Sequence, residues 1–333
     1  MLLVPHTSAS AWPDSRPDAL WRRFRTGDAE GCRVALLGLP DDTGVLLNGG
    51  RVGAAGGPAA FRAALSLFGE CYDALAHREL GVGVFDAGDV IPAAPKGPSE
   101  GEGTREPALR QTHDRASEAV AAMLGAGLIV VCVGGGHDLT FPTIRALARR
   151  AGGPVGGVNV DPHLDVRETA GSGMPFRAAI EGGFLDAERF VEYGVSRFAN
   201  SREHVEWAKG RGVALIPFER AVEHRSAMST ALERMSRGSA EPAFVSFDLD
   251  AVDAAFAPGV SAANPMGFTV EQACRIARRA GEHESVRCFD IMELCPAHDD
   301  FGGSPSGKRV GRTARVAALL FLHFLTGVAE RRS

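Results

Sequence analysis

Residues 158–167 read VNVDPHLDVR, and the fold can be worked out from this stretch. It joins the end of a short apolar run, residues 155–160, to a cluster of polar side chains. A buried strand that ends in polar residues is typical of a parallel α/β sheet, in which functional loops lie beyond the carboxyl ends of the strands. Side chains two positions apart point the same way in an extended segment, so we expect Asp161, His163 and Asp165 to converge.

Two further apolar runs end in the same manner. Residues 130–140, VVCVGGGHDLT, place His137 after three glycines, and residues 244–253, FVSFDLDAVD, place Asp248 and Asp250 two positions apart. Neighbouring strands lie about 4.8 Å apart, so these groups can share one centre with the first cluster. Four or more buried carboxylates repel one another unless a cation lies between them, which predicts a metal site.

The mixture of donor atoms indicates which cation is bound. Two imidazoles among carboxylates suit a borderline divalent ion such as Mn²⁺, whereas a site made of oxygen alone favours Mg²⁺ or Ca²⁺. The alternative is that single members of the pattern are structural, because an Asp at a strand end is commonly a helix cap or a turn residue. Asp138 and Asp253 are the acids to which that alternative applies best.

Short apolar runs alternate with longer Ala-, Arg- and Glu-rich stretches along the chain. We predict strands at residues 33–39, 81–86, 128–133, 155–160, 189–194, 214–217, 243–247 and 286–291. We predict helices at residues 58–67, 116–126, 140–150, 202–209, 221–236, 270–280 and 313–325. This alternation predicts a three-layer α/β/α fold with a largely parallel sheet of about eight strands. We expect one domain, residues 31–330, after an N-terminal extension, residues 1–30, with loops at 91–112, 167–173 and 299–311.

Composition excludes several classes of protein. The chain has 333 residues and 45% hydrophobic residues, which is ordinary for a globular protein. Lys and Arg number 36 against 41 Asp and Glu, and this net charge of −5 argues against nucleic-acid binding. The six Cys residues stand singly, which is typical of reduced thiols. Because we find neither a secretion signal nor an apolar run of about 20 residues, we expect no membrane association and a cytoplasmic protein.

The segments GGGH, DPHLD and SFDLDAVDAAFAPG together carry a family resemblance. They resemble the Gly-Gly-x-His, Asp-Ala-His-x-Asp and Ser-x-Asp-x-Asp-x-x-Asp…Pro-Gly segments of the ureohydrolase family, which includes arginase, agmatinase and formimidoylglutamase. The likeness continues through GVSAANP, MELCP and GRTAR, so that it extends from about residue 38 to residue 325. The resemblance implies the arginase-like α/β fold, a small-molecule substrate and a homo-oligomer, either a trimer or a hexamer.

The same resemblance implies a site with two Mn²⁺ ions. One ion would be bound by His137, Asp161, Asp165 and Asp248, and the other by Asp161, His163, Asp248 and Asp250. Two metals about 3.5–4 Å apart acidify a shared water, and the family mechanism is attack of a metal-bridging hydroxide on the amidine or guanidinium carbon. Glu293 matches the family glutamate that pairs with the cationic group of the substrate.

The segment SGMPFR bears on the substrate. Arginases and agmatinases commonly have His-Gly-x-Pro here, and that His is their candidate proton shuttle, whereas this chain has Ser172, which cannot titrate near neutral pH. Formimidoylglutamases resemble this variant, which implies hydrolysis of N-formimino-L-glutamate to L-glutamate and formamide in histidine degradation. Arg binds carboxylates bidentately, so Arg167 and Arg177 are candidates for the substrate carboxylates. Asn200 and Arg202 in FANSR are further candidates.

Two alternatives stay open at this point. A guanidino-compound hydrolase of the same family, such as an agmatinase, a guanidinobutyrase or an arginase-like enzyme, would release urea instead of formamide. A non-catalytic family member would keep the fold without turnover, although all six expected ligand positions are filled. The stretch GGSPSGKR, residues 302–309, is close to a phosphate-binding P-loop, but Arg309 stands where that motif needs Ser or Thr, and a loop is the better interpretation.

Overall fold

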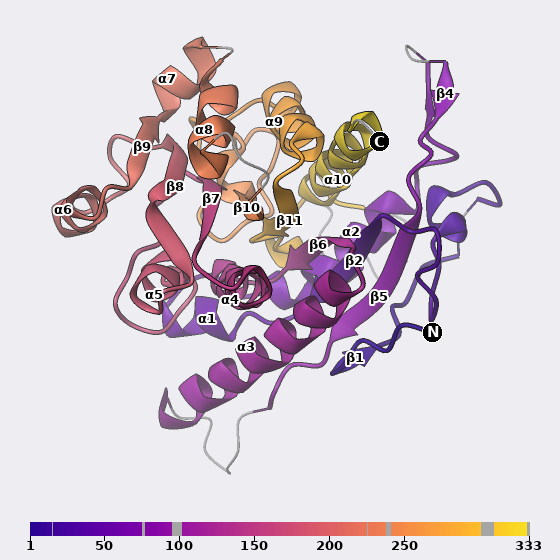
Figure 1. The fold of residues 1–333 in the computed structure, drawn as a ribbon, viewed down its shortest axis with the longest axis horizontal. Coiled ribbons are helices and arrows are strands. Elements are labelled where there is room, and N and C mark those ends of the chain that lie inside the picture. Colours follow the sequence, from indigo (N-terminus) through magenta and orange to yellow (C-terminus); the bar gives the residue numbers. More distant parts are fainter. Residues whose placement is uncertain are drawn as a thin grey trace.

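The computed structural model describes the whole chain except residues 15, 75–76, 95–101, 225, 238–240, 301–309 and 332–333. A nine-stranded sheet with the order β1-β5-β2-β6-β11-β10-β7-β8-β9 runs through this part of the chain (Figure 1). The strands are β1 (Thr7–Ser8), β2 (Val34–Leu39), β5 (Val84–Val90), β6 (Ile129–Gly134), β7 (Val155–Val160), β8 (Leu185–Val195), β9 (Ala214–Pro217), β10 (Ala243–Asp248) and β11 (Val286–Met292). A separate hairpin is formed by β3 (Tyr72–Asp73) and β4 (Arg78–Glu79).

The predicted parallel sheet of about eight strands is confirmed. Every neighbouring pair from β5 to β9 is parallel, and β1 adds an antiparallel strand at the edge. The strand β1 lies within residues 1–30, and its Thr7 pairs with Val90. Trp12 lies in the same segment and donates a hydrogen bond to Asp86 over 2.7 Å. The N-terminal residues therefore pack along the edge of the sheet that the rest of the chain forms.

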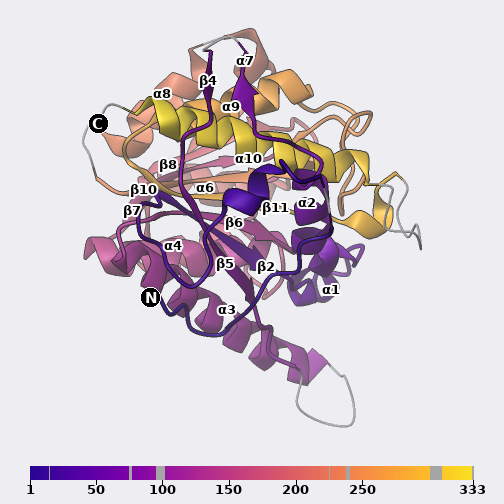
Figure 2. The ribbon, with the colours of Figure 1, turned by 90° about the vertical axis from the view of Figure 1, so that its right-hand side faces the viewer.

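Helices cover both faces of the sheet (Figures 1 and 2). The helices are α1 (Thr43–Leu47), α2 (Gly57–Leu65), α3 (Glu102–Gly125), α4 (Thr140–Ala151), α5 (Pro175–Glu181), α6 (Arg202–Gly210), α7 (Phe218–Glu223), α8 (Ala227–Ser236), α9 (Val270–Glu282) and α10 (Arg312–Glu330). Buried residues of α2, α8, α9 and α10 form one core with one face of the sheet, and those of α3, α4 and α5 form a second core with the other face. Because both faces are covered, β2, β6, β7 and β10 are buried at every residue.

Three sequence predictions about elements were wrong. Residues 102–112 were expected in a loop because they are rich in Gly, Glu and Pro, yet they form the first turns of α3, which contains Pro107 within the helix. The helix predicted at 221–236 is two helices, α7 and α8. The short helices α1 and α5 were missed because five and seven residues carry too little periodicity to detect.

The helix α10 is long and apolar enough to cross a membrane by length and composition. However, it packs against α9 and α2, and 61% of its apolar window is buried inside the protein. Phe321 and Phe324 on this helix are fully buried and contact Phe61 and Phe289, so the apolar composition of α10 is explained by the core. The loop expected at 299–311 lies mostly outside the described residues, and so does the stretch 302–309.

Candidate metal centre

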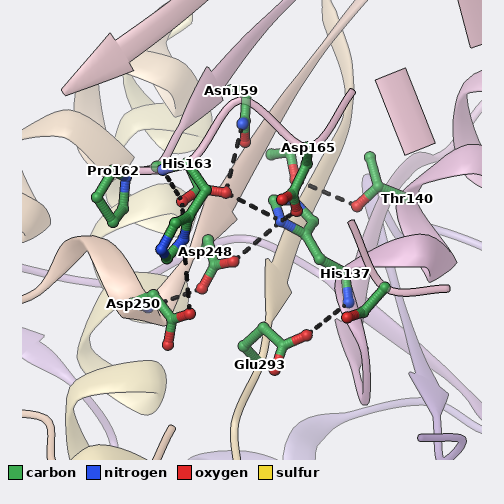
Figure 3. Close-up of polar contacts among 12 residues, drawn as sticks. His137, Thr140, Asn159, Pro162, His163, Asp165, Asp248, Asp250 and Glu293 are labelled. Atoms are coloured by element: carbon green, nitrogen blue, oxygen red, sulfur yellow. Dashed lines mark hydrogen bonds and ion pairs between the residues drawn. The ribbon is translucent and has the colours of Figure 1, made fainter. Parts of the chain in front are cut away.

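The polar residues predicted to form a site follow four neighbouring strands at the carboxyl edge of the sheet (Figure 3). His137 follows β6, Asp161 directly follows β7, Asp248 is the last residue of β10 with Asp250 two positions later, and Glu293 directly follows β11. The strands β6, β11, β10 and β7 are consecutive in the sheet, although β11 and β6 are far apart in sequence. Parallel strands thus bring segments from across the chain to one edge.

Four of the predicted ligands form one compact cluster. The Nδ1 atom of His137 lies 3.2 Å from Asp161 Oδ2, 2.9 Å from Asp165 Oδ2 and 2.9 Å from Asp248 Oδ2. One donor atom from each of these residues lies within 4.8 Å of the other three; His137, Asp161 and Asp248 are buried, and Asp165 is partly exposed. Such an arrangement of one imidazole and three carboxylates can hold a divalent cation.

The other two predicted ligands lie beside this cluster. His163 Nδ1 is 3.1 Å from Asp161 Oδ1 and 3.9 Å from Asp250 Oδ2. Asp161 therefore faces His137 with one carboxylate oxygen and His163 with the other. A second cation position between His163 and Asp250, sharing Asp161 with the first, is compatible with this geometry.

The buried Nδ1 atom of His137 tests whether the cluster suits a cation. It has no hydrogen-bond partner, although three carboxylate oxygens surround it. The opposite ring atom, Nε2, lies 2.9 Å from the Ser246 hydroxyl, and that hydroxyl donates to Asp290. Because Ser246 already uses its proton, it accepts from the His137 Nε2–H, which leaves Nδ1 facing the carboxylates. Burial would lower the pKa of His137, but the charge of Asp248 and the short contacts with the three acids raise it, so Nδ1 holds a proton that a metal ion could replace.

Backbone turns orient the carboxylates. Asp161 Oδ1 accepts from the His163 N–H over 2.7 Å, and Asp248 Oδ1 accepts from the Asp250 N–H over 2.7 Å. Asp165 has a left-handed backbone, with φ of 45°. The sequence analysis predicted that Asp161, His163 and Asp165 converge because side chains alternate along an extended segment. Residues 161–165 lie outside the strand, however, and turns closed by side chain-to-backbone hydrogen bonds bring the donors together. Strained backbone of this kind is common at functional sites.

Crowding of acids shifts several ionisation equilibria. Burial, followed by the charge of Asp161, raises the pKa of Asp248 to about 7. Burial and then the charge of Asp248 raise the pKa of Glu293 to about 8, and burial and then Asp248 also raise the pKa of Asp250. Burial would lower the pKa of His163, but its hydrogen bond to Asp161 and the surrounding acids raise it to about 9. The protein alone therefore retains protons that a cation would displace.

A row of buried polar residues supports the cluster from within the sheet, and the sequence analysis missed it. Glu192 of β8 pairs in register with Asn159 of β7, Asn159 with Ser246 of β10, and Ser246 with Asp290 of β11. All four are at most 1% exposed. Thr140 donates to Asp290 over 3.1 Å and lies 3.2 Å from Ser246. The sequence feature that could have revealed this row is the presence of a polar residue inside each of four strands that are otherwise largely apolar.

A cavity of about 320 Å³ opens onto the cluster. His163, Asp165, Asp248, Asp250 and Glu293 form one part of its lining. The remaining polar lining is Asn48, Arg167, Ser172, Asn200, Ser201, His204 and Ser261. Arg167 is the one Arg or Lys among the described lining residues. The sequence analysis did not predict that Asn48 and His204 line the cavity, because neither residue directly follows a predicted strand.

The structure distinguishes among the predicted substrate residues. Ser172 lines the cavity, and its Oγ lies 2.8 Å from the amide of Asn48. Asn200 also lines it, but its amide donates to the Pro162 carbonyl and accepts from the Leu164 N–H, both over 2.9 Å. The polar atoms of Asn200 are therefore used to hold the loop that carries His163, rather than being free for a ligand.

Two of the predicted arginines lie away from the cavity lining. Arg177 forms ion pairs with Glu181 over 3.0 Å and with Glu168 over 3.5 Å, and it stacks on Trp207. Arg202 is highly exposed and lies 3.8 Å from Glu206. Arg177 stands in α5, and the turn of that helix directs its side chain toward its own acidic neighbour. We therefore withdraw Arg177 as a candidate for the substrate carboxylates and Arg202 as a further candidate for substrate contact.

Glu293 occupies a special position in the cavity wall. Its backbone is left-handed, with φ of 63°, and its N–H donates to the Gly135 carbonyl over 2.9 Å. Oε1 of Glu293 accepts from the His137 N–H over 2.9 Å, while Oε2 is buried and has no hydrogen bond of normal geometry, although the Ser261 side chain lies close enough to lower the pKa of this carboxyl. An unpaired carboxylate oxygen beside a cluster of metal-ligand type can accept hydrogen bonds from a cationic ligand.

Comparison with known proteins is consistent with this geometry. Formimidoylglutamase of Geobacillus thermodenitrificans is 30% identical to this chain, and the match covers 93% of this chain and 92% of that enzyme. The human mitochondrial guanidino acid hydrolase is 29% identical over 90% of this chain and 80% of its own. The crystal structure of Trypanosoma cruzi formiminoglutamase with two Mn²⁺ is 29% identical and covers 96% of this chain and all of that one, with a TM-score of 0.80.

The family model gives the broadest match. It is described as the arginase family and matches residues 32–327, nearly the whole chain. Members of this family act on small molecules and hydrolyse the carbon–nitrogen bonds of guanidino or amidine groups. The agreement of family model, sheet topology and ligand geometry leads to one conclusion. This chain belongs to the arginase family.

Proposed function

We propose that this protein hydrolyses N-formimino-L-glutamate to L-glutamate and formamide, with two Mn²⁺ ions held by His137, Asp161, His163, Asp165, Asp248 and Asp250. The observation that carries the proposal is the cavity, which is lined by four of these donors, His163, Asp165, Asp248 and Asp250, together with Glu293 and Arg167. Bound divalent cations would supply an acidified water as the nucleophile near neutral pH. The relatives named formimidoylglutamase and the Mn²⁺-containing neighbour support both the reaction and the metal.

Glu293 is positioned to orient the reacting group. Its unpartnered Oε2 would accept hydrogen bonds from the protonated amidine, while Oε1 stays anchored on the His137 N–H. This contact would hold the amidine carbon beside the cation positions and would fix its plane, which places the reactants in an attack geometry. The bond that breaks joins the amidine carbon to the glutamate nitrogen, and that nitrogen leaves with a proton.

Arg167 would recognise the acidic end of the substrate. Arg167 is an exposed residue that lines the cavity, and its guanidinium has no hydrogen bond or ion pair among the described residues. A free guanidinium suits a carboxylate, because it can donate two hydrogen bonds to it. The same feature would disfavour agmatine, because the end opposite its reacting guanidinium is a cationic amine.

A guanidino acid is the second candidate substrate. The human relative named guanidino acid hydrolase and the Pseudomonas aeruginosa relative named guanidinopropionase, 32% identical over 91% of this chain, favour it. Such a compound also places one carboxylate at the far end of a chain, where Arg167 could bind it. Ser172, at the position of the family His, is the observation that favours the formimino substrate.

The test compares substrates with metal-loaded enzyme. We would incubate the purified protein and Mn²⁺ with N-formimino-L-glutamate, guanidinobutyrate, guanidinopropionate, arginine and agmatine, and measure glutamate, formamide and urea. Glutamate and formamide from the first compound would support the proposal. Urea from a guanidino acid, with no glutamate from the first compound, would transfer the assignment to the second candidate.

Two further predictions concern the protein as a whole. We propose that it is cytoplasmic and that it forms a homo-oligomer, a trimer or a hexamer. Light scattering after size-exclusion chromatography tests the oligomer against the chain mass of 35.0 kDa. A mass of one chain at micromolar concentration would refute that part of the proposal.

A further inference from the structure

Glu192 is a buried acid that the proposed reaction does not use. It lies in the middle of β8, is 0% exposed, and has no cationic partner in the described part of the chain. Its one hydrogen-bonded partner is Asn159 of the neighbouring strand, whose Nδ2 donates to Glu192 Oε2 over 2.9 Å. A buried carboxylate without a cation is costly, so its retention calls for a specific role.

Asn159 joins Glu192 to the cluster. The same Nδ2 that donates to Glu192 also donates to Asp161 Oδ2, over a longer distance of 3.5 Å. Asp161 Oδ2 is the oxygen that faces His137, and Asp161 Oδ1 is the oxygen that faces His163. The amide therefore contacts the carboxylate that stands between the two imidazoles.

The orientation of this amide is the decisive feature. The two ends of an Asn side chain are nearly equal in size, so packing alone does not distinguish them. With the NH₂ end toward the two acids, Asn159 Oδ1 remains buried without a partner. With the ends exchanged, the amide oxygen would face the Asp161 carboxylate, which carries no hydrogen-bond donor, and would repel it. Glu192 is the acceptor that holds the NH₂ end in place.

We infer that Glu192 and Asn159 form a positioning pair that orients Asp161 for cation binding. The inference rests on the proposed function, because it assumes that Asp161 binds a metal. Neither residue touches substrate or metal, so both act through Asp161. Partners of metal ligands typically change metal affinity by about 10–100-fold when they are removed.

The experiment measures Mn²⁺ affinity and stoichiometry by isothermal titration of metal-free protein, together with the melting temperature. Asn159→Leu removes the donor at similar volume, and Glu192→Met removes the acceptor that orients it. We expect each variant to weaken at least one Mn²⁺ site by about tenfold or more. Glu192→Gln keeps a carbonyl acceptor for Asn159, so we expect its affinity to stay within about threefold of the unmodified protein.

Thr143→Val is the matched control. Thr143 is equally buried and its hydroxyl lies near Leu139 and Cys132 rather than the cluster, so the substitution should change the melting temperature and leave Mn²⁺ affinity unchanged. Affinity within twofold of the unmodified protein in both Asn159→Leu and Glu192→Met would overturn the inference. If Asn159→Leu does not fold, the two Glu192 variants decide. An unmodified protein that binds no Mn²⁺ would instead overturn the proposed function and the inference with it.

Discussion

Replacing Asp250 with alanine should remove one cation position and leave the metal-free protein at least as stable as before. Asp250 is 3% exposed, and burial together with the charges of Asp248 and Glu293 raises its pKa. Its carboxylate accepts one hydrogen bond, from the Ala262 N–H over 3.3 Å. Removing it therefore relieves repulsion among buried acids and sacrifices a single long hydrogen bond, while it deletes the predicted partner of His163 at the second cation position.

The size of the effect follows from linkage. A ligand at 100 times its Kd stabilises the folded state by about 2.7 kcal/mol for each site. Unfolding entropy of about 2.1 cal/mol/K per residue gives about 0.7 kcal/mol/K for 333 residues, so each occupied site should raise the melting temperature by about 4 °C. The unmodified protein should gain about 8 °C from two sites, and Asp250→Ala about half of that.

The assay combines elemental analysis of bound Mn²⁺ with thermal denaturation in the presence and absence of metal. Asp253→Ala is the control, because Asp253 lies three positions later and its carboxylate accepts from the Ala255 N–H, outside the cavity lining. The control should bind two Mn²⁺ ions. Two fully occupied sites in Asp250→Ala, with unchanged affinity, would refute the assignment of Asp250 as a ligand and the reasoning from geometry that led to it.

Three further predictions address the cavity, the pH dependence and the packing beneath the site. Arg167→Ala should raise KM for an acidic substrate by roughly tenfold, because a charge-assisted hydrogen bond is lost. Arg177→Ala is the control and should not change KM. Equal effects of the two substitutions in steady-state kinetics would contradict the assignment of Arg167. Glu293 has its pKa raised from 4.5 to about 8, so it binds more protons folded than unfolded, and the metal-free protein should lose stability as pH rises from about 4.5 to 8. Urea denaturation across that range should show a smaller loss in Glu293→Gln, and an equal loss would contradict the burial of this acid. Gly157→Ala would place a Cβ atom 2.0 Å from the Phe244 ring, so it should destabilise the fold by about 1–3 kcal/mol, and an unchanged urea midpoint would refute that packing argument.

Local patterns in the chain were enough to predict the layers of the fold. Continuous apolar runs such as residues 155–160 can be buried on both faces only within a covered parallel sheet, and helical stretches between the runs supply the cover. The same runs indicated where polar residues emerge, so all six expected ligand residues and Glu293 are found together at one edge. Boundaries were less predictable, since the first turns of α3 have the composition of a loop.

Partnerships between distant side chains were not predictable from the sequence. Arg167 and Arg177 are equivalent in the sequence, yet Arg167 lines the cavity and Arg177 pairs with Glu181 and Glu168. Asn200 reads as a polar loop residue, whereas its amide is used to hold the loop that carries His163. These outcomes depend on where neighbouring helices direct each side chain, which no local pattern encodes.

The sequence by itself therefore determined the parallel α/β architecture and the set of donors at its carboxyl edge, because burial and alternation act over a few residues. Only the tertiary structure decided which side chains meet. It placed Glu192, Asn159, Ser246 and Asp290 in one row because strand order and register bring separate segments side by side. Register across a sheet is a long-range property, and the support beneath the cluster exists only once the strands have paired.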